Sequence, residues 1–172
     1  MADQGPLEMI ITNNNLPLLV QLEELMRQNI HAAMRRIGLQ VERCAVLHIQ
    51  NQDLDWKALS DIWMDYKTKH GYSTDTYIMT SSYQQSITWQ YTEAEFKLDV
   101  GVMKSAMWIN PATGEIQPMW QIAEALEYGY PDHNLPARPL WAPVLEENRR
   151  SAQTILGVAI KKSMTQIAEQ AK

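Results

Sequence analysis

The stretch EYGYPDHNLPARPLWAPVLEEN, residues 127–148, holds four prolines, at positions 131, 136, 139 and 143, and no proline follows them. Proline lacks a backbone N–H and disfavours helix at the residue before it. The stretch therefore stays extended until a helix begins near residue 141. It divides the chain into a short helix over 120–129, a proline-rich arm over 130–140 and a C-terminal helix over 141–170.

Arg138 lies in this arm between two prolines and is the only lysine or arginine between Lys104 and Arg149. Its stiff backbone loses little entropy when the side chain finds a partner. Glu127, on the preceding helix, is the nearest candidate, because an arginine–carboxylate pair would fix the angle of the arm. A carboxylate of a neighbouring subunit is an alternative, and an exposed Arg138 in a plain linker is another.

Helical periodicity marks the two ends of the chain and one segment between them. A long amphipathic helix is predicted over 16–50, after the cap signal NNN and with Gly38 as a tolerated weak point. A short helix is predicted over 58–70, ending at Gly71. A short strand is predicted over 7–12, and residues 72–85 have an irregular pattern.

The period changes to two over residues 86–103, where apolar and polar residues alternate on both sides of TEAE. This pattern predicts an antiparallel β-hairpin. A smaller hairpin is predicted around the turn NPATG, residues 110–114. We therefore expect a single α+β domain over residues 1–172. Its antiparallel sheet is built round the central hairpin and packed by the long N-terminal and C-terminal helices.

Composition is that of an ordinary globular chain: 172 residues, 45% hydrophobic and 20% charged, with a net charge of −5. The negative charge argues against a broad nucleic-acid-binding surface. The single cysteine cannot form an internal disulfide. The first residues lack a secretory signal, and no run of about 18 apolar residues predicts a membrane helix. We expect a soluble protein made in a cytoplasm.

Catalytic and metal-binding motifs are not recognised. The histidines His31, His48, His70 and His133 are widely spaced, and neither HxxxH nor CxxC occurs. Cys44 is interpreted as a small buried hydrophobe. The sequence has no GxGxxG, GxxxxGK[ST] or GxSxG motif. We therefore predict no catalytic residue, no cofactor and no metal site, and a protein that is not an enzyme.

Tryptophans and tyrosines between residues 56 and 91 are interleaved with Lys57, Lys67, Lys69 and His70, a mixture that can stack single-stranded bases. Trp63 and Tyr66 share a helical face, and Trp89 and Tyr91 share a strand face, which favours core or interface roles. A small nucleic-acid-binding or regulatory protein is kept as an alternative function.

The arm and its flanks resemble a signature of tailed-bacteriophage neck and minor-tail proteins, the tail-completion or virion-morphogenesis family. That signature has a Glu-x-Gly step, a Pro-Ala-Arg-Pro box and an acidic C-terminal helix. The matching residues are Glu127, Gly129, Pro136, Ala137, Arg138 and Pro139. Upstream, the family-like residues are Trp56, Leu59, Ser60, Thr80, Ser86 and Ile87. Ser81 replaces a usual glycine, which could adopt positive φ more easily than serine.

The resemblance implies a structural virion protein: a ring-forming neck or tail-completion component that joins or completes the tail at the head–tail junction. A tail-terminator or head-closure ring of the same junction is an alternative. The implied partners are copies of the chain, with six as the expected ring number, and other connector and tail proteins. DNA would pass through the lumen without sequence-specific binding, and no membrane is implied. The implied location is the virion, after assembly in the host cytoplasm.

Overall fold

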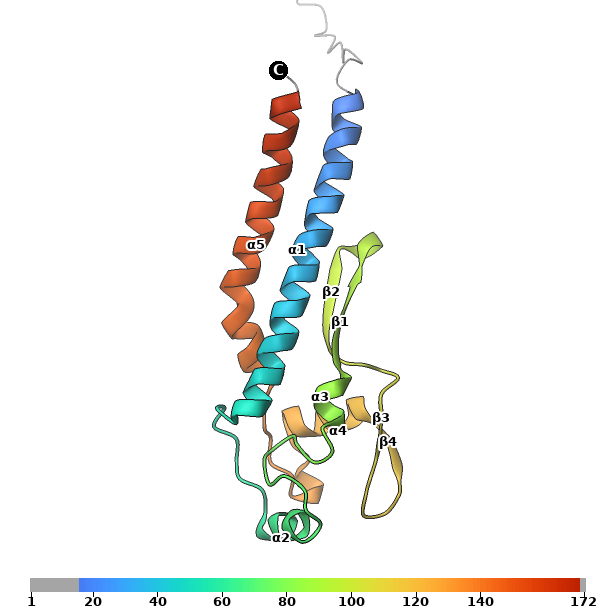
Figure 1. The fold of residues 1–172 in the computed structure, drawn as a ribbon, viewed down its shortest axis with the longest axis vertical. Coiled ribbons are helices and arrows are strands. Elements are labelled where there is room, and N and C mark those ends of the chain that lie inside the picture. Colours follow the sequence, from blue (N-terminus) through green and yellow to red (C-terminus); the bar gives the residue numbers. More distant parts are fainter. Residues whose placement is uncertain (1–15, 171–172) are drawn as a thin grey trace, which may run out of the picture.

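The computed structural model describes residues 16–170, and the strand predicted over 7–12 lies outside them. The helices are α1 (Leu16–Asn51), α2 (Asp61–Lys69), α3 (Ser82–Ser86), α4 (Met119–Tyr128) and α5 (Trp141–Gln170), with 3-10 turns η2 (Glu93–Glu95) and η3 (Pro131–His133). The strands are β1 (Ile87–Thr92), β2 (Lys97–Val102), β3 (Met107–Ile109) and β4 (Ile116–Pro118). The predicted α+β class, with long helices at both ends and antiparallel hairpins between them, is confirmed (Figure 1).

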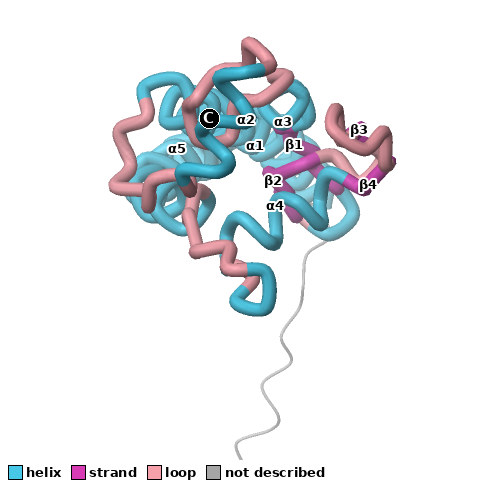
Figure 2. Tube along the Cα trace, turned by 90° about the horizontal axis from the view of Figure 1, so that it is seen from below, coloured by secondary structure: helices cyan, strands magenta, loops and turns pink. Residues whose placement is uncertain are grey.

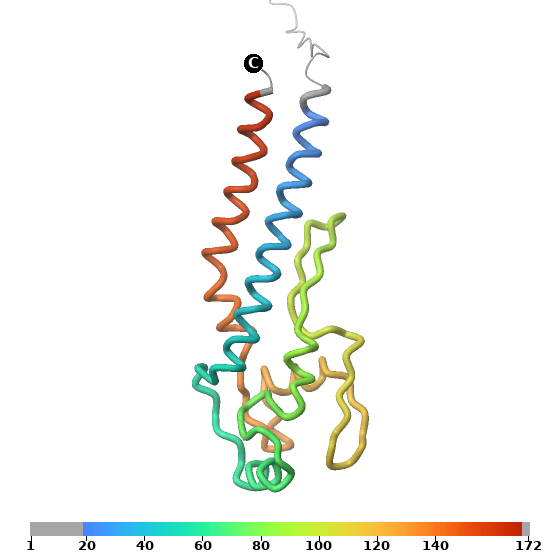
Figure 3. The backbone as a smooth tube through the Cα atoms, viewed as in Figure 1, coloured from blue at the N-terminus to red at the C-terminus, as the bar shows by residue number. Residues whose placement is uncertain are grey.

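Helices α1 and α5 lie side by side and antiparallel, and we call this pair the stalk (Figures 1 and 3). Small and polar side chains line the contact. Asn29 Nδ2 donates to Ser163 Oγ at 2.9 Å, and Gln40 Nε2 donates to Asn148 Oδ1 at 2.8 Å. None of the helices within residues 16–170 combines the length and hydropathy that a membrane span requires.

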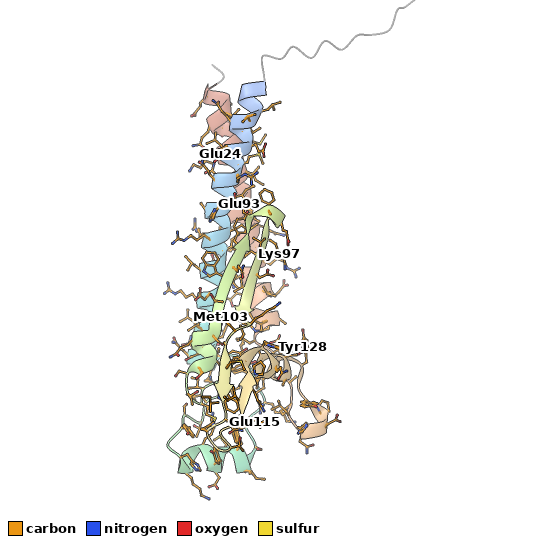
Figure 4. The ribbon with its side chains drawn as sticks, turned by 90° about the vertical axis from the view of Figure 1, so that its right-hand side faces the viewer. Glu24, Glu93, Lys97, Met103, Glu115 and Tyr128 are labelled. Atoms are coloured by element: carbon orange, nitrogen blue, oxygen red, sulfur yellow. The ribbon has the colours of Figure 1, made fainter. Side chains whose placement is uncertain are left out.

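The β1–β2 hairpin packs against α1 on the side away from α5 (Figure 1). Gly38 makes this contact close, since a Cβ there would lie 2.7 Å from the Trp89 ring. The glycine that breaks the helical pattern is thus a packing site for a tryptophan. At the end of the hairpin, Arg27 of α1 pairs with Glu93 at 3.5 Å; Glu93 is labelled in Figure 4.

The main core lies at the base of the molecule, where the C-terminal end of α1 meets α3, α4 and the start of α5. Its buried members are Ile37, Val41, Ala45, Ile49, Tyr83, Ile87, Met119, Ala123, Leu140 and Val144. Seen from the base, α5 and the β3–β4 hairpin lie on opposite sides of α1 (Figure 2).

Three details differ from the predictions. Helix α2 begins at Asp61 rather than 58, because Ser60 is extended and its side chain accepts a hydrogen bond from Trp63 N. Helix α3 forms inside the segment predicted to be irregular. The two hairpins make two separate two-stranded sheets. The smaller hairpin around residues 110–114 is confirmed.

Candidate functional site

The arm, residues 130–140, folds back onto α4 instead of running free. Tyr130 and Leu135 exchange backbone hydrogen bonds of 2.7 and 3.1 Å, which close a small loop around η3. Arg138 N then donates to Leu126 O of α4 at 2.7 Å. The arm is therefore closed on itself over residues 130–135 and attached to α4 at Arg138 before α5 begins.

Gly129 permits this fold-back. Its backbone has φ 76° and ψ 170°, a region that only glycine occupies readily. A Cβ at this position would lie 2.7 Å from Ala137 N and 2.9 Å from Leu135 O. The glycine of the Glu-x-Gly step is required for both its backbone angles and its close neighbours.

Arg138 ties the arm to the segment before α2. Its side chain is 3% exposed. Its Nε donates to Lys57 O at 2.7 Å and its Nη2 donates to Ala58 O at 2.9 Å. Burial lowers the pKa of Arg138, but an arginine stays charged at neutral pH. Two of the three sequence interpretations, a pair with Glu127 and an exposed linker residue, are wrong for the described chain, whereas a carboxylate of a neighbouring subunit stays a prediction.

The Glu127 carboxylate binds backbone N–H groups at the start of α5 and does not pair with Arg138. Its Oε2 accepts from Leu140 N at 2.7 Å and Trp141 N at 3.0 Å, and its Oε1 accepts from Ala142 N at 3.1 Å. Leu140 N immediately precedes α5, and the other two amides belong to its first turn, where helix N–H groups lack intrahelical partners and the helix dipole favours an anion. Glu127 therefore fixes where α5 starts and the direction in which it leaves.

Two aromatic residues complete the attachment. Trp56 Nε1 donates to Pro139 O at 2.7 Å, and the Tyr77 hydroxyl donates to Arg138 O. The two rings pack together with centroids 4.8 Å apart. We call Trp56, Tyr77, Glu127, Gly129 and Arg138 the arm anchor.

Lys67 holds the loop that carries Tyr77. It is 2% exposed, and its Nζ donates to Asp75 O and Ile78 O, both at 2.7 Å. Burial lowers the pKa of Lys67; the nearby charge of Asp75 opposes this shift and that of Arg138 adds to it. Lys67 and Arg138 are both buried cations that bind backbone carbonyls, so each uses its charge to fix a loop.

A groove of about 1290 Å³ opens beside the arm anchor. Its walls come from residues 57–63, residues 76–80, α4 and the arm, and they are largely apolar. Ile62 and Tyr128 line it and are 85% and 78% exposed; Tyr128 is labelled in Figure 4.

The remaining family-like residues also lie at the base. Leu59, Pro136 and Ala137 line the groove, and Thr80 Oγ1 lies 2.7 Å from Ser82 Oγ. Ser86 is buried and donates to Tyr83 O, while Ile87 belongs to the core. Residues from three distant segments are thus brought to one end of the molecule, in backbone-fixing or packing roles.

The aromatic middle segment is mostly engaged internally. Trp56 and Tyr83 both pack against Tyr77. On α2 and just after it, the rings of Trp63, Tyr66, His70 and Tyr72 stack in succession. Each of these rings therefore has an aromatic neighbour within the chain.

One cluster with metal-binding chemistry was not predicted from the sequence. Cys44, His48 and Glu147 offer ligand atoms within 4.8 Å of one another. Cys44 and His48 are four residues apart on α1, a spacing that places two side chains on one helical face. That CxxxH spacing was the available signal; Glu147 comes from α5 and had none.

No protein-family model, curated protein or solved structure matches this chain.

Proposed function

We propose that this chain is a structural protein of the head–tail junction of a tailed bacteriophage, where it forms a ring that joins or completes the tail. The proposal is supported mainly by the structural roles of the family-like residues. Glu127, Gly129 and Arg138 all fix the path of the backbone near the point where the arm meets α5. Such an arrangement holds a long helix in one direction, which suits an assembly component.

Exposed apolar side chains support assembly with other proteins. Soluble monomers seldom display large apolar patches unless those patches serve as interfaces. The exposed apolar residues on the stalk are Leu19, Val20, Leu39, Leu47, Leu145, Val158, Ile160 and Met164. Those near the base are Ile62, Met64, Met107, Ile109, Ile116, Trp120, Tyr128 and Tyr130. The stalk and the base therefore both expose apolar side chains that a neighbouring copy or another junction protein would cover.

The ring proposal includes six copies, contacts to connector and tail proteins, and DNA passing through the lumen. The net charge of −5 supports a lumen that does not retain DNA, since phosphate repels acidic surfaces. The location in this proposal is the virion.

The test combines assembly in solution with phage genetics. Light scattering after size exclusion is expected to give a mass several times the 19.8 kDa of one chain, and electron micrographs are expected to show rings. A phage that lacks the chain is expected to package DNA but to make few infectious joined particles. Normal infectious titre from a clean deletion would overturn the proposal.

A further inference from the structure

The Cys44, His48 and Glu147 cluster lies where the C-terminal end of α1 faces the first turns of α5. Cys44 and His48 are partly buried, and Glu147 is exposed. His48 Nε2 lies 3.0 Å from Glu147 Oε2. The three side chains offer a sulfur, an imidazole nitrogen and a carboxylate oxygen, the three ligand types that zinc takes from proteins.

We propose that Cys44, His48 and Glu147 form a binding site for a divalent transition-metal ion of the zinc class, with water in the fourth position. In a tetrahedral zinc site, neighbouring ligand atoms lie about 3.3–3.6 Å apart, as follows from zinc bond lengths of about 2.0–2.3 Å. The ligand atoms here lie within 4.8 Å of one another, so side-chain movements of about 1 Å close the set. The site is independent of the proposed phage function.

Asp53 supports the assignment from outside the ligand set. Its Oδ1 lies 2.6 Å from His48 Nδ1, on the ring edge opposite Glu147. Metal-binding histidines commonly donate their second ring N–H to a carboxylate, which fixes the tautomer and the ring orientation. Asp53 therefore directs the Nε2 lone pair of His48 toward the space shared with Cys44 and Glu147.

Protons compete with a metal ion for the ligand atoms of His48 and Cys44. Burial lowers the pKa of His48, but its hydrogen bonds to Asp53 and Glu147 raise it by more, so the net shift is upward. Burial also raises the pKa of the Cys44 thiol. Because thiolate and neutral imidazole are the metal-binding forms, a divalent ion competes with protons at both groups.

Metal binding would join α1 to α5 near the start of the stalk. Gln40 already bridges to Asn148 and Ser151 one turn further along. An ion held by residues from both helices stabilises the folded chain by its binding free energy, because the unfolded chain does not hold the three ligands together.

The test uses Co²⁺ as a spectroscopic probe on the reduced full-length protein after treatment with a chelator. The expected result is a thiolate-to-cobalt charge-transfer band that saturates at one ion per chain and disappears on addition of Zn²⁺. Zn²⁺ is also expected to raise the melting temperature, and a chelator to reverse that rise. Absence of a saturable band would overturn the proposal.

Variants separate this site from adventitious surface binding. Cys44→Ser is expected to abolish the charge-transfer band, and Glu147→Gln to weaken binding by at least about tenfold. Glu146→Gln is the matched control, since Glu146 is the adjacent exposed acid and pairs with Arg149 at 3.0 Å. Melting without metal shows whether each variant folds. Equal weakening by Glu146→Gln and Glu147→Gln would overturn the assignment. Ring assembly is measured separately, so loss of metal binding and loss of the proposed function give different results.

Discussion

The base and the stalk are held together by different kinds of contact. At the base, the buried charges of Glu127 and Arg138 bind backbone amides and carbonyls. In the stalk, α1 and α5 meet through small residues, through neutral polar groups such as Asn29 and Ser163, and through the partly exposed His48–Glu147 contact near the base. A buried charge tolerates few geometries because an unsatisfied one is costly. The base therefore sets direction, whereas the stalk presents surface and tolerates more change.

Removal of the Arg138 side chain is expected to have the largest effect on stability and so tests the role of buried charge at the base. Arg138→Ala deletes two charge-assisted hydrogen bonds and leaves the carbonyls of Lys57 and Ala58 without those donors. We expect a loss of about 3–4 kcal/mol in the free energy of unfolding, measured by urea denaturation.

Two further variants test the Arg138 prediction. Arg138→Lys is expected to recover part of the loss, because lysine lacks the planar fork. Arg149→Ala, on the exposed surface of α5, is expected to change stability by under about 0.5 kcal/mol. If Arg138→Ala melts like the parent protein, the contacts of Trp56, Tyr77, Glu127 and Gly129 hold the arm without the Arg138 side chain.

A pair of glycine substitutions compares the two regions directly. Gly129→Ala forces a side chain into a glycine-only conformation and against Ala137 N, so we expect a loss of about 2–3 kcal/mol. Gly157→Ala, in α5 of the stalk, meets nothing within 4 Å and is expected to stabilise the chain by up to about 1 kcal/mol. Thermal melting of both variants checks the opposite signs; a shared sign would remove the distinction between base and stalk.

Glu127→Gln tests whether the anionic cap on α5 matters. The variant keeps one acceptor oxygen but turns an NH₂ group toward backbone N–H donors, and it removes the charge that complements the helix dipole. We expect a loss of about 2 kcal/mol in unfolding free energy. Glu124→Gln, an exposed acid on the same helix, is the control and is expected to have little effect. Equal losses from the two variants would show that helix charge, not capping, is involved.

Much of the fold follows from local patterns in the sequence. The prolines place the start of α5 at Trp141, and the alternation over 86–103 gives the β1–β2 hairpin. These features depend on residues that are close together in the sequence, so local patterns predict them.

The partners at the base did not follow from the sequence, because they are backbone atoms. The carbonyls of Lys57 and Ala58 lie 81 and 80 residues before Arg138, and a carbonyl has no residue-type signature. Pairing opposite charges by proximity in the sequence gave Glu127 instead. The spacing of Cys44 and His48 was visible in the sequence. The third residue of the cluster, Glu147, lies beside them only because α5 packs on α1.

The smallest expected effect is in the stalk. Ser163 is fully buried, and its hydroxyl lies within hydrogen-bond distance of Ala159 O, Leu25 O and Asn29 Nδ2. Ser163→Ala removes this hydroxyl, but Asn29 Nδ2 retains Gln166 Oε1 at 3.1 Å, and alanine favours helix more than serine. These terms offset each other, so we expect a change below about 1 kcal/mol, measured by the same urea denaturation. A loss above about 2 kcal/mol would mean that the stalk, like the base, depends on a specific buried polar contact.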